Sequence, residues 1–146
     1  MKLKFKIVTP EKVVFEKEID QVTLPTQTGQ ITVLPNHIPL LSALLAGELI
    51  IKIDKEEIPL AISGGFVEVK PGSEIVVLTE TAEHAQDIDE TRALEAKKRA
   101  EDLLKNAKNK EEVDYTALAA KIEKELARLK VARRRKPTHQ PTIQSE

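Results

Sequence analysis

The distribution of glycine and proline constrains this sequence more than any other feature. All five glycines and six of the eight prolines lie in residues 1–72, whereas residues 73–136 contain neither. Glycine and proline mark turns and interrupt helices, so the first part is typical of short strands and the second part of helices. The charge changes as well. Residues 1–87 carry 8 Lys and Arg against 13 Asp and Glu, and residues 88–146 carry 15 against 11.

Composition limits the kinds of site that the chain can hold. Its 146 residues carry a formal net charge of −1, which excludes a globally basic nucleic-acid binder. There is no cysteine, so disulfides and thiolate zinc sites are excluded, and no two of the three histidines have metal-ligand spacing. The longest apolar stretch, Leu40–Ala46, is far shorter than the ~20 residues that span a bilayer. We therefore expect a soluble, cytosolic protein that requires no cofactor and is at most peripheral to a membrane complex.

The first part of the chain predicts a β-domain. Leu3, Phe5 and Ile7 alternate with lysines, which is the pattern of a half-buried strand. The turn Lys70–Ser73 and the polar segment Asp54–Glu57 each lie between two apolar runs, as in hairpins. Many short strands at close spacing indicate an antiparallel sandwich or a flattened barrel. The later expected strands are Glu48–Ile53, Ile58–Ile62, Phe66–Val69 and Ile75–Thr79.

The second part predicts two helices. Asp87 is the expected N-cap of the first, with Glu90 in capping-box position, and Asp114 is the expected N-cap of the second. The connection is the polar segment Lys108–Glu112, which is short enough for an antiparallel hairpin. The hairpin buries little area, so we expect it to lean on the β-domain or on a partner. The candidate buried residues are Ala93, Ala96, Ala100, Leu103, Leu104 and Ala107 on the first helix, and Tyr115, Leu118, Ile122, Leu126 and Leu129 on the second.

These patterns divide the chain into three parts. We expect a β-domain at residues 1–87, a helical hairpin at residues 88–136 and a tail at residues 137–146 that is rich in Pro, Thr, Gln and Ser. A tail of this composition is typical of disordered segments.

Several motifs, in order along the chain, resemble the epsilon subunit of F-type ATP synthases. Gly29–Leu41 contains a Leu-Pro-Asn-His-Ile-Pro turn, and Ser63–Val69 begins with Ser-Gly-Gly. Asp87–Ala93 resembles the start of the family's first C-terminal helix. Asp114 and Tyr115, with the segment Leu129–Ala132, resemble its second helix. The resemblance extends from Phe5 to about Ala132, so it covers nearly the whole chain.

The resemblance implies a fold and a role. The fold is α+β: an N-terminal antiparallel sandwich of about ten short strands, followed by a C-terminal antiparallel two-helix hairpin. The sandwich would lie at the foot of the central stalk, in contact with the gamma subunit and the ring of c subunits. Folded, the hairpin lies on the sandwich. Extended, it runs along gamma and blocks ATP hydrolysis. The subunit itself catalyses nothing and would lie, peripherally, at the cytoplasmic face of the bacterial membrane.

The resemblance also implies a regulatory ATP site on the folded hairpin. The segment Asp87–Ala93 can equally be an ordinary capped helix start. As a site, the helix N-terminus would meet adenine and ribose, and guanidinium groups would neutralise phosphates. Lys124 stands where the family has arginine and lacks its bidentate geometry. The candidate residues by position are Glu83, Ile88, Asp89, Arg92, Ala93, Arg99, Lys124 and Arg128.

Two further surfaces have competing interpretations. Residues 121–136 carry 8 positive charges and only two glutamates. This run is either a solvated helix face or a surface that binds an acidic segment of the beta subunits through Arg133, Arg134 and Arg135. Gly29, Gln30 and His37 are candidates for contacts with gamma or the c ring, but the His37 turn is also explained as a rigid corner. Ser63-Gly64-Gly65 favours a bulge or close strand crossing over a phosphate loop, because it lacks the lysine and helix of such loops.

The main alternative function is a nucleic-acid-binding module that uses the basic second helix. The acidic β-domain and the four aromatic side chains, Phe5, Phe15, Phe66 and Tyr115, provide no stacking platform for it. An enzyme is disfavoured because no nucleophile–base grouping, paired histidines or phosphate loop is visible.

Overall fold

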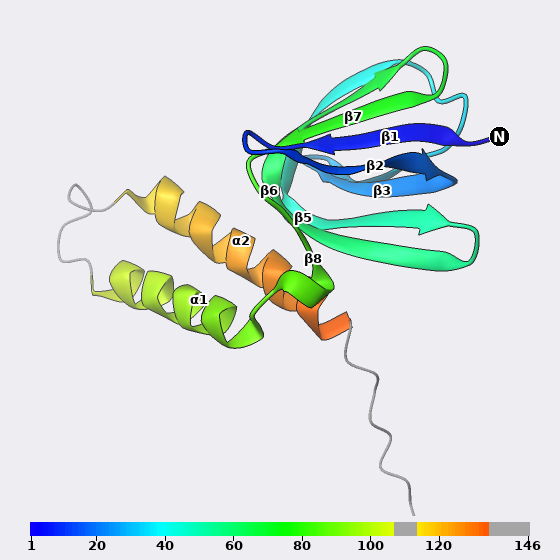
Figure 1. Ribbon diagram of the computed structural model, residues 1–146. Helices are drawn as coiled ribbons and strands as arrows, with labels where there is room; N and C mark the ends of the chain where they lie inside the picture. Colours follow the sequence, from blue (N-terminus) through cyan, green and yellow to red (C-terminus); the bar gives the residue numbers. More distant parts are fainter. Residues whose placement is uncertain (107–113, 135–146) are drawn as a thin grey trace, which may run out of the picture.

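The computed structural model describes residues 1–106 and 114–134. Within them, strands gather in one body and two helices lie together along its side (Figure 1). The expected connection Lys108–Glu112, the apolar position Ala107, Arg135 and the tail from Pro137 lie outside the described residues. The elements are β1 (Leu3–Val8), β2 (Val13–Ile19), β3 (Gln21–Thr26), β4 (Gly29–Val33), β5 (Leu40–Ile53), β6 (Glu56–Lys70), β7 (Glu74–Thr79), β8 (Ala82–His84), the 3-10 helix η1 (Ala85–Asp87), α1 (Glu90–Lys105) and α2 (Tyr115–Arg134).

Two long strands organise the sandwich. The strand order is β2-β1-β7-β6-β5-β3-β4, and β8 also pairs with β6. Strands β5 and β6, with 14 and 15 residues, pair antiparallel along nearly their whole length. Residues 60–62 of β6 pair with β8, and residues 65–70 pair with β7. Because β5 and β6 continue through both layers, one hydrogen-bonded sheet folds over to form the sandwich.

The α+β fold class is confirmed, but two details differ from the expectation. The described residues form eight strands rather than about ten, because the expected strands Ile58–Ile62 and Phe66–Val69 are both parts of β6. In addition, β1 and β7 pair in parallel, so the sheet is mixed. Gly64 and Gly65, with φ of 102° and 144°, allow β6 to bend without ending. A Cβ atom on Gly65 would lie 2.0 Å from the carbonyl oxygen of Leu78, which confirms the expected close strand crossing.

The interior of the sandwich is apolar and separate from the contact with the hairpin. Leu3, Phe5 and Ile7 are 0–1% exposed, as their alternation predicts. Burial of each such side chain contributes about 1.5–3 kcal/mol. A second, small cluster joins the hairpin to the sandwich and consists of Ala61, Ile88, Val131 and Ala132. The sandwich therefore has its own core.

The first helix begins two residues later than expected. Asp89 is its N-cap and accepts a hydrogen bond from the backbone N–H of Arg92 at 3.1 Å, whereas Asp87 lies in η1. The expectation of an Asp87 cap was wrong because Ile88 is extended and buried against the second cluster, which delays the helix. The Asp114 cap of α2 is confirmed: its Oδ1 accepts from the backbone N–H of Ala117 at 3.0 Å.

The helices pair antiparallel, and α2 lies between α1 and the sandwich (Figure 1). The expected buried stripe of α2 was partly wrong, because Tyr115 and Leu126 are 40% and 45% exposed. On α1, Leu103 is 59% exposed. The buried residues of α1 are both alanines, which permit close approach to α2. Among the described residues, the buried members of the two helices are Ala93, Ala100, Glu125, Ala127, Leu129, Val131 and Ala132.

Candidate functional site at the junction of hairpin and sandwich

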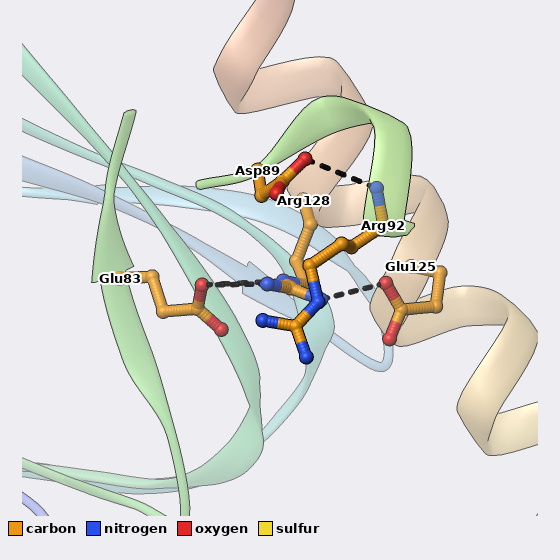
Figure 2. Close-up of polar contacts among 5 residues, drawn as sticks. All are labelled: Glu83, Asp89, Arg92, Glu125 and Arg128. Carbon is orange, nitrogen blue, oxygen red and sulfur yellow. Dashed lines mark hydrogen bonds and ion pairs between the residues drawn. The ribbon is translucent and has the colours of Figure 1, made fainter. Parts of the chain in front are cut away.

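A half-buried arginine joins α2 to the sandwich. Arg128 lies between Glu83 of β8 and Glu125, one turn earlier on α2 (Figure 2). Its Nε and Nη2 atoms lie 3.2 and 3.1 Å from Glu83 Oε2, and its Nη1 atom lies 2.9 Å from Glu125 Oε2. Strand β8 positions Glu83 through its pairing with β6, where Glu83 is opposite Ala61. We call Glu83, Glu125 and Arg128 the arginine clamp.

The clamp keeps its charges in a poorly hydrated place. Burial alone would lower the pKa of Arg128, but the charge of Glu83 and the hydrogen bond and charge of Glu125 outweigh burial, and the pKa is raised. The side chain of Glu125 is only 6% exposed, so its negative charge depends on Arg128 for compensation. Two carboxylates and one guanidinium leave the clamp with a net negative charge. The clamp therefore attaches α2 to β8 through the attraction between Arg128 and Glu83.

The start of α1 lies beside the clamp. Figure 2 shows Asp89 and Arg92 in the same cluster as Arg128. The Asp89 carboxylate caps the helix, and the Arg92 side chain is exposed. Ile88 is 9% exposed and Ala93 is fully buried, so these two contribute packing at the junction. The structure thus brings together four residues of the expected nucleotide site: Glu83, Asp89, Arg92 and Arg128.

Two more candidate cations lie on the same helices. Arg99 is exposed and follows Arg92 by about two helical turns, which places both on one face of α1. Lys124 is half-buried and precedes Arg128 by about one turn on α2. Each helix therefore carries a second positive charge on the face of its clamp-side arginine.

The arginines at the end of α2 are also paired within the chain. Arg133 Nε lies 3.3 Å from Glu90 Oε1, and Arg134 Nε lies 2.6 Å from Glu48 Oε2. Arg135, the third arginine of the expected beta-subunit contact, lies outside the described residues. Two of the three expected contact arginines are thus held by carboxylates of their own chain in this folded arrangement.

Glu48 is a charged residue in an otherwise apolar part of β5. Its side chain is 3% exposed. Neither of its oxygens has a hydrogen-bond partner within residues 1–106 and 114–134, so the contact with Arg134 is an ion pair without a hydrogen bond. A buried carboxylate needs a compensating cation, and Arg134 supplies it only while α2 lies on the sandwich.

The expected contact residues for gamma or the c ring fall in two places. Gly29 and Gln30 are exposed where β4 begins, and they line a hollow together with Glu48 and Lys130 of α2. His37 is half-buried: its backbone N–H donates to the Leu34 carbonyl at 3.2 Å, and its Nδ1 lies 2.6 Å from the Ile38 carbonyl. The neighbouring Asn36 N–H donates to Ser73 Oγ at 2.9 Å, which ties this corner to the β6–β7 turn.

Sequence reasoning missed Glu125 and Glu48. Glu125 could have been found from its spacing, because an acidic residue three positions before Arg128 lies on the same helix face and can pair with it. Glu48 could have been found from its surroundings, because it is the only charged residue between Leu40 and Ile51. Within the described residues, no group of three or more metal-binding side chains occurs, and no helix is long and apolar enough to cross a membrane.

Comparison with solved structures relates the fold to ATP synthase subunits. A chain of the mitochondrial ATP synthase of Euglena gracilis, in a structure that includes the c-ring, aligns with a TM-score of 0.73 and 19% identity over 86% of this chain and 79% of that one. A chain from the central stalk and c-ring of the Tetrahymena thermophila mitochondrial ATP synthase aligns with a TM-score of 0.57 and 16% identity, over 92% and 96%. At these identities the likeness supports the fold alone.

Sequence comparison identifies the family. The family model described as "ATP synthase, Delta/Epsilon chain, beta-sandwich domain" matches residues 2–85, and the one described as "long alpha-helix domain" of the same chain matches residues 86–133. The ATP synthase epsilon chain of Dehalococcoides mccartyi is 48% identical over 139 residues, which cover 92% of this chain and 95% of that protein. This chain therefore belongs to the Delta/Epsilon chain family of ATP synthases.

Proposed function

We propose that the protein is a non-catalytic subunit of the central stalk of an ATP synthase, peripheral to the cytoplasmic face of the membrane. It couples gamma to the c ring during ATP synthesis driven by an ion gradient. Its hairpin inhibits ATP hydrolysis when it leaves the sandwich and extends. The observation that carries the proposal is the nature of the attachment between hairpin and sandwich: a four-residue apolar cluster and a few ion pairs.

The attachment is small in comparison with the core that it leaves intact. Among the described residues, seventeen buried side chains form the core of the sandwich, whereas four form the cluster that joins the hairpin to it, and two of these four belong to α2 itself. Hydrophobic stabilisation scales with buried apolar area, so detachment of the hairpin costs far less than unfolding of the sandwich. This difference supports a hairpin that moves as a unit.

An apolar face of the sandwich supports docking to a larger subunit. Ala43, Phe66 and Leu78 are paired in register across β5, β6 and β7, and the latter two are 56% and 53% exposed. On β5, Leu41 and Leu45 are 72% and 42% exposed. A large exposed apolar patch is typical of a protein interface. We assign this face to gamma, with His37 at its border and with Gly29 and Gln30 as a separate contact with the c ring.

The folded hairpin is also proposed to bind ATP as a regulatory ligand. The support is the convergence of Arg92 and Arg128 with the capped start of α1 and with Glu83 (Figure 2). A ligand shifts a conformational equilibrium only by its difference in affinity for the two states. ATP bound across the folded hairpin would therefore oppose inhibition.

The first test compares the full chain with a fragment that ends at Asp87. Both are added to a purified catalytic head and gamma assembly that lacks this subunit, and ATP hydrolysis is followed at low and high ATP. We expect both to bind and only the full chain to inhibit, most strongly at low ATP. If both bind and neither inhibits, the hairpin is not a brake. If neither binds, the stalk assignment fails.

The second test neutralises the end of α2. Replacing Arg133, Arg134 and Arg135 with glutamine removes charges that would grip an acidic segment of the beta subunits. It also removes the pairs of Arg133 with Glu90 and of Arg134 with Glu48, and this loss favours the extended hairpin and works against the expected effect. We expect the half-inhibitory concentration to rise about tenfold at low salt, which corresponds to about 1.4 kcal/mol, with a smaller change at high salt.

The matched control for this test has the same change in charge on α1. Glutamine at Lys97, Lys98 and Lys105 removes three positive charges without altering the end of α2. This control should inhibit as the unchanged chain does. Unchanged inhibition by the arginine variant at low salt would contradict the proposed grip.

A further inference from the structure

The donors of Arg128 are already engaged in the absence of any ligand. A guanidinium presents five N–H donors in a planar fork, and both of its sides are suited to a carboxylate or a phosphate. Glu83 accepts from the Nε and Nη2 side, and Glu125 accepts from Nη1. A phosphate group can take over either of these sides of Arg128 only where the carboxylate on that side withdraws.

The two carboxylates differ in their freedom to withdraw. The side chain of Glu83 is 26% exposed and can turn toward water. The side chain of Glu125 is 6% exposed, and α2 holds it one turn from Arg128. Moving an ionised carboxylate away from its cation while it remains buried is strongly unfavourable. Glu125 is therefore the fixed competitor for the guanidinium.

The negative charge of Glu125, like its position, opposes the binding of a phosphate group to Arg128. With both glutamates ionised, the clamp is net negative, so an approaching polyphosphate meets repulsion in addition to an occupied fork. Water and salt screen this repulsion only weakly, because the charges are close together and partly buried. Removing the charge of Glu125 leaves Arg128 balanced by Glu83 alone.

We infer that Glu125 sets the affinity of the folded hairpin for the polyphosphate of ATP, by competing for the Nη1 side of Arg128. This inference rests on the proposed nucleotide site and adds a residue to it. Glu125 lowers the affinity and, while no nucleotide is bound, takes the place of a phosphate on the Nη1 side of Arg128, whose other side joins α2 to Glu83 of β8. The folded hairpin is thereby stable without ligand and responds only to high concentrations of ATP.

Isothermal titration of the full chain with ATP tests the inference. The variant is Glu125→Gln, which keeps the shape of the side chain and removes its charge. The matched control is Glu123→Gln, the same change at an exposed position of the same helix. We expect ATP to bind Glu125→Gln at least about tenfold tighter than the unchanged chain, and Glu123→Gln to bind within about twofold of it.

The outcomes separate this inference from the proposed site. Equal affinities for Glu125→Gln and Glu123→Gln, or weaker binding by Glu125→Gln, overturn the role of Glu125 and leave the nucleotide site standing. No heat from any of the three proteins at millimolar ATP overturns both. Thermal melts followed by circular dichroism establish that each variant is folded. If Glu125→Gln does not fold, Glu125→Leu places an apolar side chain of similar size at the buried position and gives the same test.

Discussion

Replacing Gly65 with alanine is expected to destabilise the sandwich by about 3–5 kcal/mol, from the combined cost of a strained backbone and an overpacked contact. The φ angle of Gly65 is 144°, which alanine rarely adopts. The added Cβ atom would lie 2.0 Å from the carbonyl oxygen of Leu78 and 3.0 Å from the Cα atom of Thr79. Both neighbours are backbone atoms of the paired strand β7, so relief requires separation of β6 from β7. Urea unfolding followed by circular dichroism measures the loss as a lower midpoint.

Gly72→Ala provides the matched control for this substitution. Gly72 also has a positive φ, of 85°, but a Cβ atom there would meet no atom within 4 Å. It should cost only about 1–2 kcal/mol, from the left-handed backbone alone. Similar losses for the two variants would show that the close approach of β6 and β7 carries no energetic weight.

Replacing Arg128 with alanine is expected to loosen α2 from the sandwich by about 3 kcal/mol, because it leaves the buried carboxylate of Glu125 without a cation. The substitution also removes the contact between Arg128 and Glu83, which joins α2 to β8. We expect amide hydrogen exchange in α2 to become about a hundredfold faster, since 1.4 kcal/mol corresponds to a factor of ten. Exchange in β5 and β7, within the sandwich core, should remain slow.

Arg133→Ala is the control for the clamp, because it removes an arginine from the same helix. The side chains of Arg133 and its partner Glu90 are 62% and 29% exposed, and solvent-exposed pairs contribute about 0–1 kcal/mol. Its effect on exchange in α2 should therefore be less than about fivefold. Equal acceleration by Arg128→Ala and Arg133→Ala would mean that burial of the clamp adds nothing to the attachment.

Local patterns in the sequence predicted much of the fold. The alternation of Leu3, Phe5 and Ile7 predicted β1 and its buried face, and the absence of Gly and Pro predicted the helices. The continuity of β6 could not be predicted, because Ser-Gly-Gly is compatible with both a break and a bend. The choice depends on tertiary pairing, because β7 and β8 pair with different parts of β6.

The positions of the candidate residues on the helices could be predicted from the sequence, whereas the contacts that depend on docking of α2 could not. Arg92 and Arg128 lie on helices whose ends are capped locally, and the resemblance to the family identified their positions. The cap at Asp89 instead of Asp87 follows from burial of Ile88 under α2, which is a tertiary contact. Glu125 and Glu48 became visible only when α2 was placed on the sandwich, because their burial depends on it.

The continuity of β5 and β6 has a mechanical consequence for the proposed role in a rotating stalk. The two strands are hydrogen-bonded from Leu40 and Val69 at one end to Ile53 and Glu56 at the other. A load along them strains many of these bonds in shear at the same time, whereas a load across them would open the bonds one after another. If the subunit has the proposed place in the stalk, torque that enters at the apolar face of β5, β6 and β7 would pass to the opposite layer through the paired backbone of these two strands and not through the turns that connect them.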